Sequence, residues 1–386
     1  MKPKWKTRIE AVKRYLKGER PTVKIYRSLQ QNKQWFYFWL KRHESGNVSW
    51  FKDTHKTNKI IHNKIDRETE SVICSIRKRL ANRKYAQKGA LPIQWELKKL
   101  KVQKIPHIWT INRILKRNNL LKEPEKYVKR NKPYPVIKAK KPNVLHELDL
   151  VGPRYLKKAN KFYSIHIIDV FSNSVCIRPI SNKKDISITE FILFAWKKLG
   201  LPKFLQVDNE LSFKGSNLYP RSFGKVIRLC LFLGVEIVFV PESEPWRQGV
   251  VEKFNDTYDK MFLRSQNFKD FKHLNKEYYV FERFHNKNHR YAKLKGKTPE
   301  KAHSEVSFKK LPGIDLNNIP WRDGKVSFVR LTDKKGNVRF FSETFKVNKE
   351  LVHEYVKGTI FTKQEKLKFY YNNRLIKVVS YKITKR

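Results

Sequence analysis

Three acidic residues lie at the edges of apolar segments, where a charged side chain is uncommon unless it meets a cation. Asp149 and Asp208 each stand at the end of a predicted core strand, and Glu252 lies in a helical pattern that follows Gly249. Carboxylates brought close together repel one another, so that one keeps its proton unless a cation neutralises them. Carboxylate and water ligands suit Mg²⁺ or Mn²⁺ rather than zinc. Two such ions about 3.5–4 Å apart activate a water or a 3′-hydroxyl for in-line phosphoryl displacement.

The sequence around these residues is similar to that of a known enzyme family. Asn209 follows Asp208, and Glu252 lies in Gln-Gly-Val-Val-Glu-Lys-Phe-Asn. With Asp149 they resemble the DDE triad of retroviral integrases and bacterial insertion-sequence transposases. The stretch 285–299 resembles the end of the same catalytic domain. The resemblance implies a transposase with two Mg²⁺ or Mn²⁺ ions per active site, Asp149 bridging both ions and Asp208 and Glu252 each holding one.

Glu244 competes with Glu252 for the third position. Glu244 lies at nearly the distance from Asp208 that is usual in the family, and Glu252 lies further along the chain. The residues flanking Glu252 match the family, however, whereas Glu244 falls in a predicted loop between Pro241 and Pro245. We therefore assign the third carboxylate to Glu252, with the extra length placed in an insertion after Asp208.

The charge of the chain predicts a polyanionic partner. Lys and Arg number 86 against 35 Asp and Glu, a formal net charge of +51, which favours double-stranded DNA. No apolar run reaches the length of a membrane span, so no membrane partner is expected. The three cysteines, Cys74, Cys176 and Cys230, are far apart and odd in number. They indicate neither a disulfide framework nor a zinc module, and suit a reducing prokaryotic cytoplasm, where the protein is expected to be nucleoid-associated.

Residues 1–50 are predicted to form a small all-α domain. Ile9, Val12 and Leu16 lie on one helical face, because they are spaced by about one turn. The domain resembles the helix-turn-helix at the front of many transposases, whose last helix enters the major groove. In that last helix Trp35, Phe36, Trp39 and Leu40 are expected to face inward. Its polar face would contact DNA through Lys33, Gln34, Tyr37, Lys41 and Arg42. A plain helical bundle is the alternative.

Residues 64–121 are predicted to form a second helix-turn-helix domain, with Thr110 and Arg113 as DNA-contacting residues of its last helix. Residues 122–143 then form a basic linker that is rich in proline, which bars a long helix. Two linked modules hold a longer stretch of DNA than one, and they gain affinity through effective concentration.

Residues 144–310 are predicted to form the catalytic core. Three apolar runs, a helix, a short strand, a helix, a strand and further helices follow in that order. This is the order of the α/β ribonuclease-H-like fold that the resemblance implies. Residues 321–386 contain closely spaced strand patterns separated by turn residues, which predict a small C-terminal β-barrel domain.

Several polar residues near the triad are candidates for other roles. Gln248, Lys253, Asn255 and Lys260 are predicted to contact the DNA end. Asp169 ends a strand pattern and is interpreted as a turn-stabilising residue. His285 and His289 are one helical turn apart, and contact with DNA or a surface position is expected for both.

The function predicted from these features is that of an insertion-sequence transposase, which binds terminal inverted repeats, cleaves at the 3′ ends and joins them to target DNA. A dimer or larger synaptic complex is expected, since two ends must be held together. Two alternatives stay open. One is an inactive, transposase-derived DNA-binding regulator, against which the presence of all three carboxylates argues. The other is a nuclease of the same fold that cuts but does not join.

Overall fold

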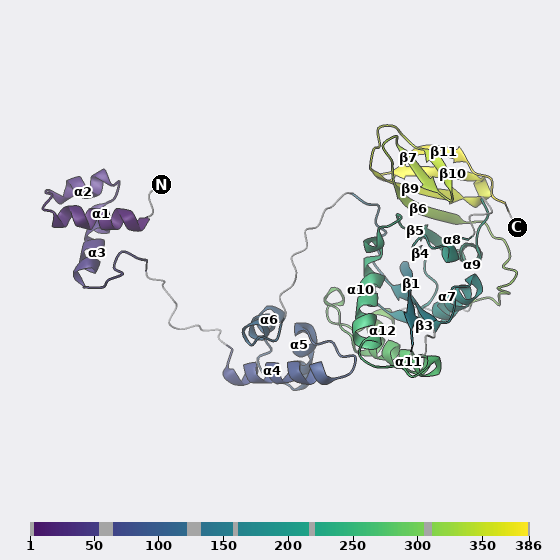
Figure 1. The fold of residues 1–386 in the computed structure, drawn as a ribbon, viewed down its shortest axis with the longest axis horizontal. Helices are drawn as coiled ribbons and strands as arrows, with labels where there is room; N and C mark the ends of the chain where they lie inside the picture. Colours follow the sequence, from purple (N-terminus) through teal and green to yellow (C-terminus); the bar gives the residue numbers. More distant parts are fainter. Residues whose placement is uncertain are drawn as a thin grey trace. The chain divides into compact units, whose positions relative to one another are not determined.

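The computed structural model describes residues 4–53, 65–121, 133–156, 161–215, 221–304 and 311–384. The chain divides into two compact units, Met1–Ile65 and Asp66–Arg386, which we describe separately (Figure 1). Within the described ranges no helix is long and apolar enough to cross a bilayer. The predicted linker, residues 122–143, lies partly outside the described residues, which resume at position 133.

The first unit contains three helices, α1 (Lys4–Leu16), α2 (Thr22–Ser28) and α3 (Lys33–Glu44). The side chain of Asn32 accepts a hydrogen bond from the Trp35 amide and caps α3, which satisfies one of the orphan amides at the helix start. Phe36, Trp39 and Leu40 are buried as predicted. Leu16 is 60% exposed, so its predicted place on the buried face of α1 is wrong.

The second unit begins with three further helices, α4 (Arg67–Asn82), α5 (Ala90–Lys99) and α6 (Ile108–Arg117). Apolar residues at helical spacing bury one face of each: Ile73, Ile76 and Leu80 of α4, Ile93 and Leu97 of α5, and Ile111, Ile114 and Leu115 of α6. The helices form within the predicted range 64–121.

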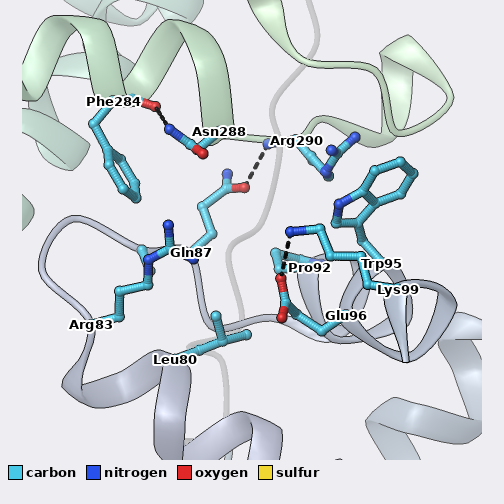
Figure 2. A pocket seen from close by; sticks show the side chains of 11 residues that line it. Leu80, Arg83, Gln87, Pro92, Trp95, Glu96, Lys99, Phe284, Asn288 and Arg290 are labelled. Carbon is cyan, nitrogen blue, oxygen red and sulfur yellow. Dashed lines mark hydrogen bonds and ion pairs between the residues drawn. The ribbon is translucent and has the colours of Figure 1, made fainter. Parts of the chain in front are cut away.

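The connection between α4 and α5 docks on α11 (Phe271–Asn288) and the residues that follow it. Tyr85 is 5% exposed and packs edge-on against Phe281, at a centroid distance of 5.2 Å. Its carbonyl lies 2.8 Å from Nε2 of His289. Figure 2 shows the adjoining pocket, where the Arg290 amide donates to Gln87 at 2.7 Å and the Arg290 guanidinium stacks 3.5 Å from the ring centroid of Trp95.

A mixed sheet carries the predicted catalytic core. Its strands and helices are β1 (Leu145–Tyr155), β2 (Lys161–Asp169), β3 (Val175–Ile180), α7 (Asp185–Leu199), β4 (Phe204–Val207), α8 (Leu211–Lys214), α9 (Lys225–Leu233), β5 (Glu236–Phe239), α10 (Gly249–Tyr258), α11 (Phe271–Asn288) and α12 (Pro299–His303). Strands β1, β2 and β3 pair antiparallel, and β4 and β5 continue the sheet parallel to β1. The predicted order of elements is confirmed, and β1 continues through Gly152-Pro153 to Tyr155.

The last part of the chain extends this sheet. Its strands are β6 (Lys325–Leu331), β7 (Asn337–Phe340), β8 (Glu343–Lys346), β9 (Tyr355–Phe361), β10 (Lys366–Tyr371) and β11 (Arg374–Ser380). Strand β6 pairs parallel with β5, and the whole sheet has the order β11-β10-β9-β6-β5-β4-β1-β2-β3. β7 and β8 form a separate hairpin. The predicted separate barrel is therefore not confirmed, because β6 covers the edge that β5 would otherwise expose.

Replacing Tyr85 with alanine tests the docking of the α4–α5 connection. Loss of a large buried ring is expected to lower the free energy of unfolding by about 3–5 kcal/mol. Urea denaturation of the full chain, followed by circular dichroism, measures the change. Tyr155→Ala is the matched control, because Tyr155 is 66% exposed and surface changes usually stay within about 0.5 kcal/mol. Equal effects of the two substitutions would show that Tyr85 does not anchor the connection.

Candidate active site

The register of the parallel strands sets Asp149 beside Asp208. β1 and β4 pair Glu147 with Gln206, and the same offset carried two residues further brings Asp149 opposite Asp208. Both residues follow the last pair of the β1–β4 ladder. Asp208 lies just past the carboxyl end of β4, whereas Asp149 lies within β1, which continues to Tyr155. Glu252 reaches the same region from the first turn of α10, which packs against β1 and β2.

A buried glutamate anchors the helix that carries Glu252. Oε2 of Glu147 accepts hydrogen bonds from the amides of Val250 and Val251, at 3.0 and 2.7 Å. These amides belong to the first turn of α10, where they have no partner within the helix. Burial raises the pKa of Glu147 to about 7, although the hydrogen bonds from the two backbone amides oppose the shift. Glu147 was not predicted as a functional residue. The sequence feature that points to it is a glutamate within an apolar strand pattern, two residues before Asp149.

The three predicted catalytic carboxylates interact electrostatically, with Asp149 as their common neighbour. Burial raises the pKa of Asp208 to about 6, and the charges of Asp149 and Glu210 add to the shift. Burial also raises the pKa of Glu252, and the charge of Asp149 adds to it. The pKa of Asp149 is itself raised by burial, against hydrogen bonds from the Leu150 amide and Asn255. The site is thus a half-buried concentration of like charge.

Asn255 orients Asp149 from the next turn of α10. Its Nδ2 donates to Oδ2 of Asp149, and its Oδ1 lies 2.7 Å from Nδ1 of His166. His166 is fully buried and faces Asp149 across the β1–β2 register. Burial lowers the pKa of His166 to about 4, so near neutral pH the ring is uncharged and its Nδ1 donates to Asn255. Asn255 was predicted to contact DNA; the structure instead engages it with Asp149 and His166.

The other residues predicted to contact the DNA end divide into buried and exposed ones. Gln248 is 3% exposed, so its side chain is buried in this structure, and its contact with the DNA end stays a prediction. Lys253 and Lys260 are exposed on the outer face of α10 and the turn that follows it. Lys260 forms an ion pair with Asp256 at 2.6 Å.

Glu244 has a structural partner outside the carboxylate group. Its two carboxylate oxygens accept hydrogen bonds from the Tyr355 hydroxyl at 2.6 and 2.8 Å. Nε of Arg247 lies 2.8 Å from Oε2 of the same residue. These contacts hold the segment before α10 against β9, and they favour Glu252 over Glu244 as the third carboxylate.

Most DNA-contact candidates of the helical domains lie on exposed faces. Lys33, Gln34, Tyr37 and Lys41 are exposed on α3. Arg42 is half-buried, with its guanidinium 4.8 Å from the ring centroid of Trp39. On α6 Arg113 is exposed and Thr110 half-buried. Trp109, which was not among the predicted DNA contacts, precedes Thr110 and is 72% exposed.

Two interpretations of isolated polar residues have different outcomes. Oδ1 of Asp169 accepts from the amide and hydroxyl of Ser172, at 2.6 and 2.7 Å, so its role in stabilising the turn is confirmed. The surface or DNA-contact prediction for His285 and His289 is wrong, because both are buried. Nε2 of His285 lies 2.8 Å from the Tyr291 hydroxyl.

The donor chemistry of the site fits a divalent cation. Burial is the main cause of the raised pKa of Asp149, Asp208 and Glu252, and the charge of Asp149 adds to the shifts of the other two. A bound cation would favour the ionised form of all three carboxylates. As the side chains stand, the described residues contain no group of three or more His, Cys, Asp or Glu arranged around one metal position. Oδ2 of Asp149 is turned to Asn255 instead.

Comparisons with known proteins found no matching protein-family model and no matching curated protein. Among solved structures, that of a simian T-cell lymphotropic virus intasome in complex with PP2A regulatory subunit B56 gamma is similar at 18% identity, over 57% of this chain and 74% of that chain, with a TM-score of 0.38. The HTLV-2 integrase catalytic core domain in complex with magnesium is 20% identical over 43% of this chain and 99% of its own, with a TM-score of 0.33. The BIV integrase catalytic core is 17% identical over 42% and 95%, with a TM-score of 0.33. At these TM-scores the likeness assigns neither a family nor an activity to the chain.

Replacing Asp208 with asparagine tests the electrostatics of the site. Because the pKa of Asp208 is raised to about 6, its ionisation destabilises the fold increasingly as the pH rises above the ordinary pKa of Asp, and the full cost is present above a pH of about 6. At a pH of about 7.5 in EDTA, Asp208→Asn should therefore raise the free energy of unfolding by roughly 3 kcal/mol. The gain should fall to about half at a pH of about 5, as the wild-type carboxyl takes up its proton. Urea denaturation across this range measures it.

Asp256→Asn is the control for that comparison, because Asp256 is an exposed carboxylate on α10, one turn beyond Glu252. Its effect should stay within about 0.5 kcal/mol at every pH. A gain for Asp208→Asn that does not change with pH would contradict the raised pKa that burial and the neighbouring charges give Asp208.

Proposed function

We propose that the protein is a DDE transposase of the insertion-sequence type, with a ribonuclease-H-like core. It would bind terminal inverted repeats, cleave the DNA at the 3′ ends and join those ends to target DNA. The observation that carries the proposal is the β1–β4 register, which sets Asp149 beside Asp208. The anchoring of α10 by Glu147 brings Glu252 to the same edge of the sheet.

Asp149, Asp208 and Glu252 would hold two Mg²⁺ or Mn²⁺ ions, with Asp149 shared between them. When bound, such ions activate the attacking oxygen and stabilise the leaving oxygen of a phosphoryl transfer. Asn255 would keep one oxygen of Asp149 oriented while the carboxylate binds metal. The buried, uncharged His166 would hold the amide of Asn255 with its Nδ2 toward Asp149.

The two helical domains would supply recognition of the DNA ends. Exposed Lys33, Lys41 and Arg113 suit phosphate contacts, and α3 and α6 are the candidate major-groove helices. A homodimer or larger synaptic complex would bring two ends together. The large positive charge suits association with the nucleoid in a prokaryotic cytoplasm.

A strand-transfer assay tests the catalytic assignment. A labelled duplex carrying the inverted repeats that flank the coding sequence is incubated with the protein, Mg²⁺ and a target plasmid. Joined product is expected from the wild type. Asp149→Asn, Asp208→Asn and Glu252→Gln should each lower the rate more than about a hundredfold, since even residues that only support metal ligands cost about 10–100-fold.

Glu244→Gln is the matched control, because Glu244 binds Tyr355 and Arg247 rather than the carboxylate group. It should lower the rate of strand transfer far less than Glu252→Gln does, because Glu244 only supports the segment before α10. Loss of joining in Glu244→Gln with activity kept in Glu252→Gln would reverse the assignment. Cleaved product without joined product would favour the nuclease, and binding without either product would favour the inactive regulator.

The affinity for DNA should fall steeply with salt, because bound lysines and arginines release counterions from the phosphates. Each phosphate-contacting lysine that is removed should lower the slope of log affinity against log salt by about 1. Lys33→Ala and Lys41→Ala are expected to do so in fluorescence anisotropy titrations with the labelled duplex. Lys363→Ala, in the 3-10 turn between β9 and β10, serves as a basic control. A flat salt dependence of the wild type would contradict phosphate-driven binding.

A further inference from the structure

A buried arginine of the C-terminal strands contacts the loop that carries Asp208. Nη2 of Arg330, in β6, donates to Oδ1 of Asn209 at 2.5 Å, and Nη1 donates to the carbonyl of Val240 at 2.8 Å. Nδ2 of Asn209 donates to the same carbonyl at 2.7 Å. The three groups close a triangle between the loop after β4, the end of β5 and β6.

The surroundings of Arg330 indicate that it is not an ordinary ion-pair residue. It is 6% exposed, and Oε1 of Glu242 lies 4.0 Å away at the edge of the ion-pair range. Its other hydrogen bonds go to the carbonyls of Val329 and Arg339, at 2.8 and 3.1 Å. Burying a guanidinium mainly among neutral acceptors is costly. A role for this guanidinium would be to fix the loop after β4, since its two Nη atoms donate to separate acceptors in a rigid geometry.

We propose that Arg330 is a positioning residue for the metal-binding carboxylate Asp208. It would act through Asn209, the next residue, by fixing where the chain leaves β4. Oδ1 of Asp208 accepts from the amide of Glu210 at 3.0 Å, so the orientation of the carboxylate depends on the path of that short loop. The inference rests on the proposed role of Asp208 in metal binding.

The same strands also hold the segment that leads to Glu252. The guanidinium of Arg247 lies between two rings, 4.0 Å from the centroid of Tyr134 and 4.6 Å from that of Tyr355. Tyr355 of β9 in turn binds Glu244. Both chain segments that enter the candidate site therefore rest on residues of β6 and β9. The C-terminal strands are thus a structural part of the site, besides any contact that they make with DNA.

The test compares Arg330→Lys with the matched control Arg221→Lys in the full chain. Arg221 also joins the C-terminal strands, through Glu343 at 2.9 and 2.8 Å, but these contacts do not involve the loop of Asp208. Affinity for Mn²⁺ is measured by electron paramagnetic resonance, and amide hydrogen exchange of residues 208–212 is measured in EDTA. Thermal unfolding and affinity for the labelled duplex report on the fold and on DNA binding.

Arg330→Lys is expected to weaken Mn²⁺ binding and to lower kcat by about 10–100-fold, the usual cost of losing a residue that orients a metal ligand. Exchange at Glu210 should accelerate, while KM for the duplex stays unchanged. Arg221→Lys should leave Mn²⁺ affinity and exchange at Glu210 as in the wild type. Unchanged Mn²⁺ affinity and exchange in Arg330→Lys would overturn the inference.

Asn209→Ala provides a second route if Arg330→Lys does not fold. It removes the acceptor for Arg330 and should reproduce the loss of Mn²⁺ affinity. The double variant should bind Mn²⁺ no less tightly than the single variant with the lower Mn²⁺ affinity, because both substitutions break the same connection. If the wild type itself binds no Mn²⁺ and cleaves no DNA, the proposed function fails. The exchange comparison in EDTA then still decides whether Arg330 fixes the loop.

Discussion

The geometry of the candidate site depends on one contact, the carboxylate of Glu147 against the amino end of α10. Helix amides without partners carry partial positive charge, so an acidic side chain is stabilising there. Here that side chain comes from β1, two residues before Asp149, rather than from the helix itself. A single strand therefore supplies one carboxylate directly and fixes the start of the helix that supplies another. Moving Glu252 relative to Asp149 would require breaking both hydrogen bonds between Glu147 and the helix amides, which are buried.

The sheet extends this constraint to the third carboxylate. Asp208 follows β4, which lies between β1 and β5, and the far side of β5 is covered by β6. A sheet flanked on both sides cannot shift one strand without disrupting ladders with its neighbours. Arg330 adds a side-chain connection from β6 to the loop after β4. Residues far downstream in the chain thus belong to the framework around the carboxylates.

Sequence patterns identified the carboxylates and the order of the elements, because apolar runs and motif context are local properties of the chain. They did not identify partners that depend on packing. The capping role of Glu147 requires knowing that α10 begins above β1, and the role of Asn255 requires His166 on the neighbouring strand. The pairing of β6 with β5 is likewise not local, since strand patterns alone do not distinguish a closed barrel from an extended sheet. His285 reads as polar in sequence but is buried by Phe254 and Tyr291.

The distribution of charge reconciles a basic protein with an acidic site. A net charge of +51 attracts a polyanion over long distances, yet exposed charges are screened beyond about 8–10 Å at physiological salt. The charge of Asp149 raises the pKa of both Asp208 and Glu252, and Lys183, whose charge lowers the pKa of Asp208, is itself bound to Glu210. The local surplus is therefore negative although the chain is strongly positive. Such a site would draw a divalent cation from solvent, and the proposed contacts with DNA would be made by exposed lysines and arginines, so the two ligands need not compete for the same groups.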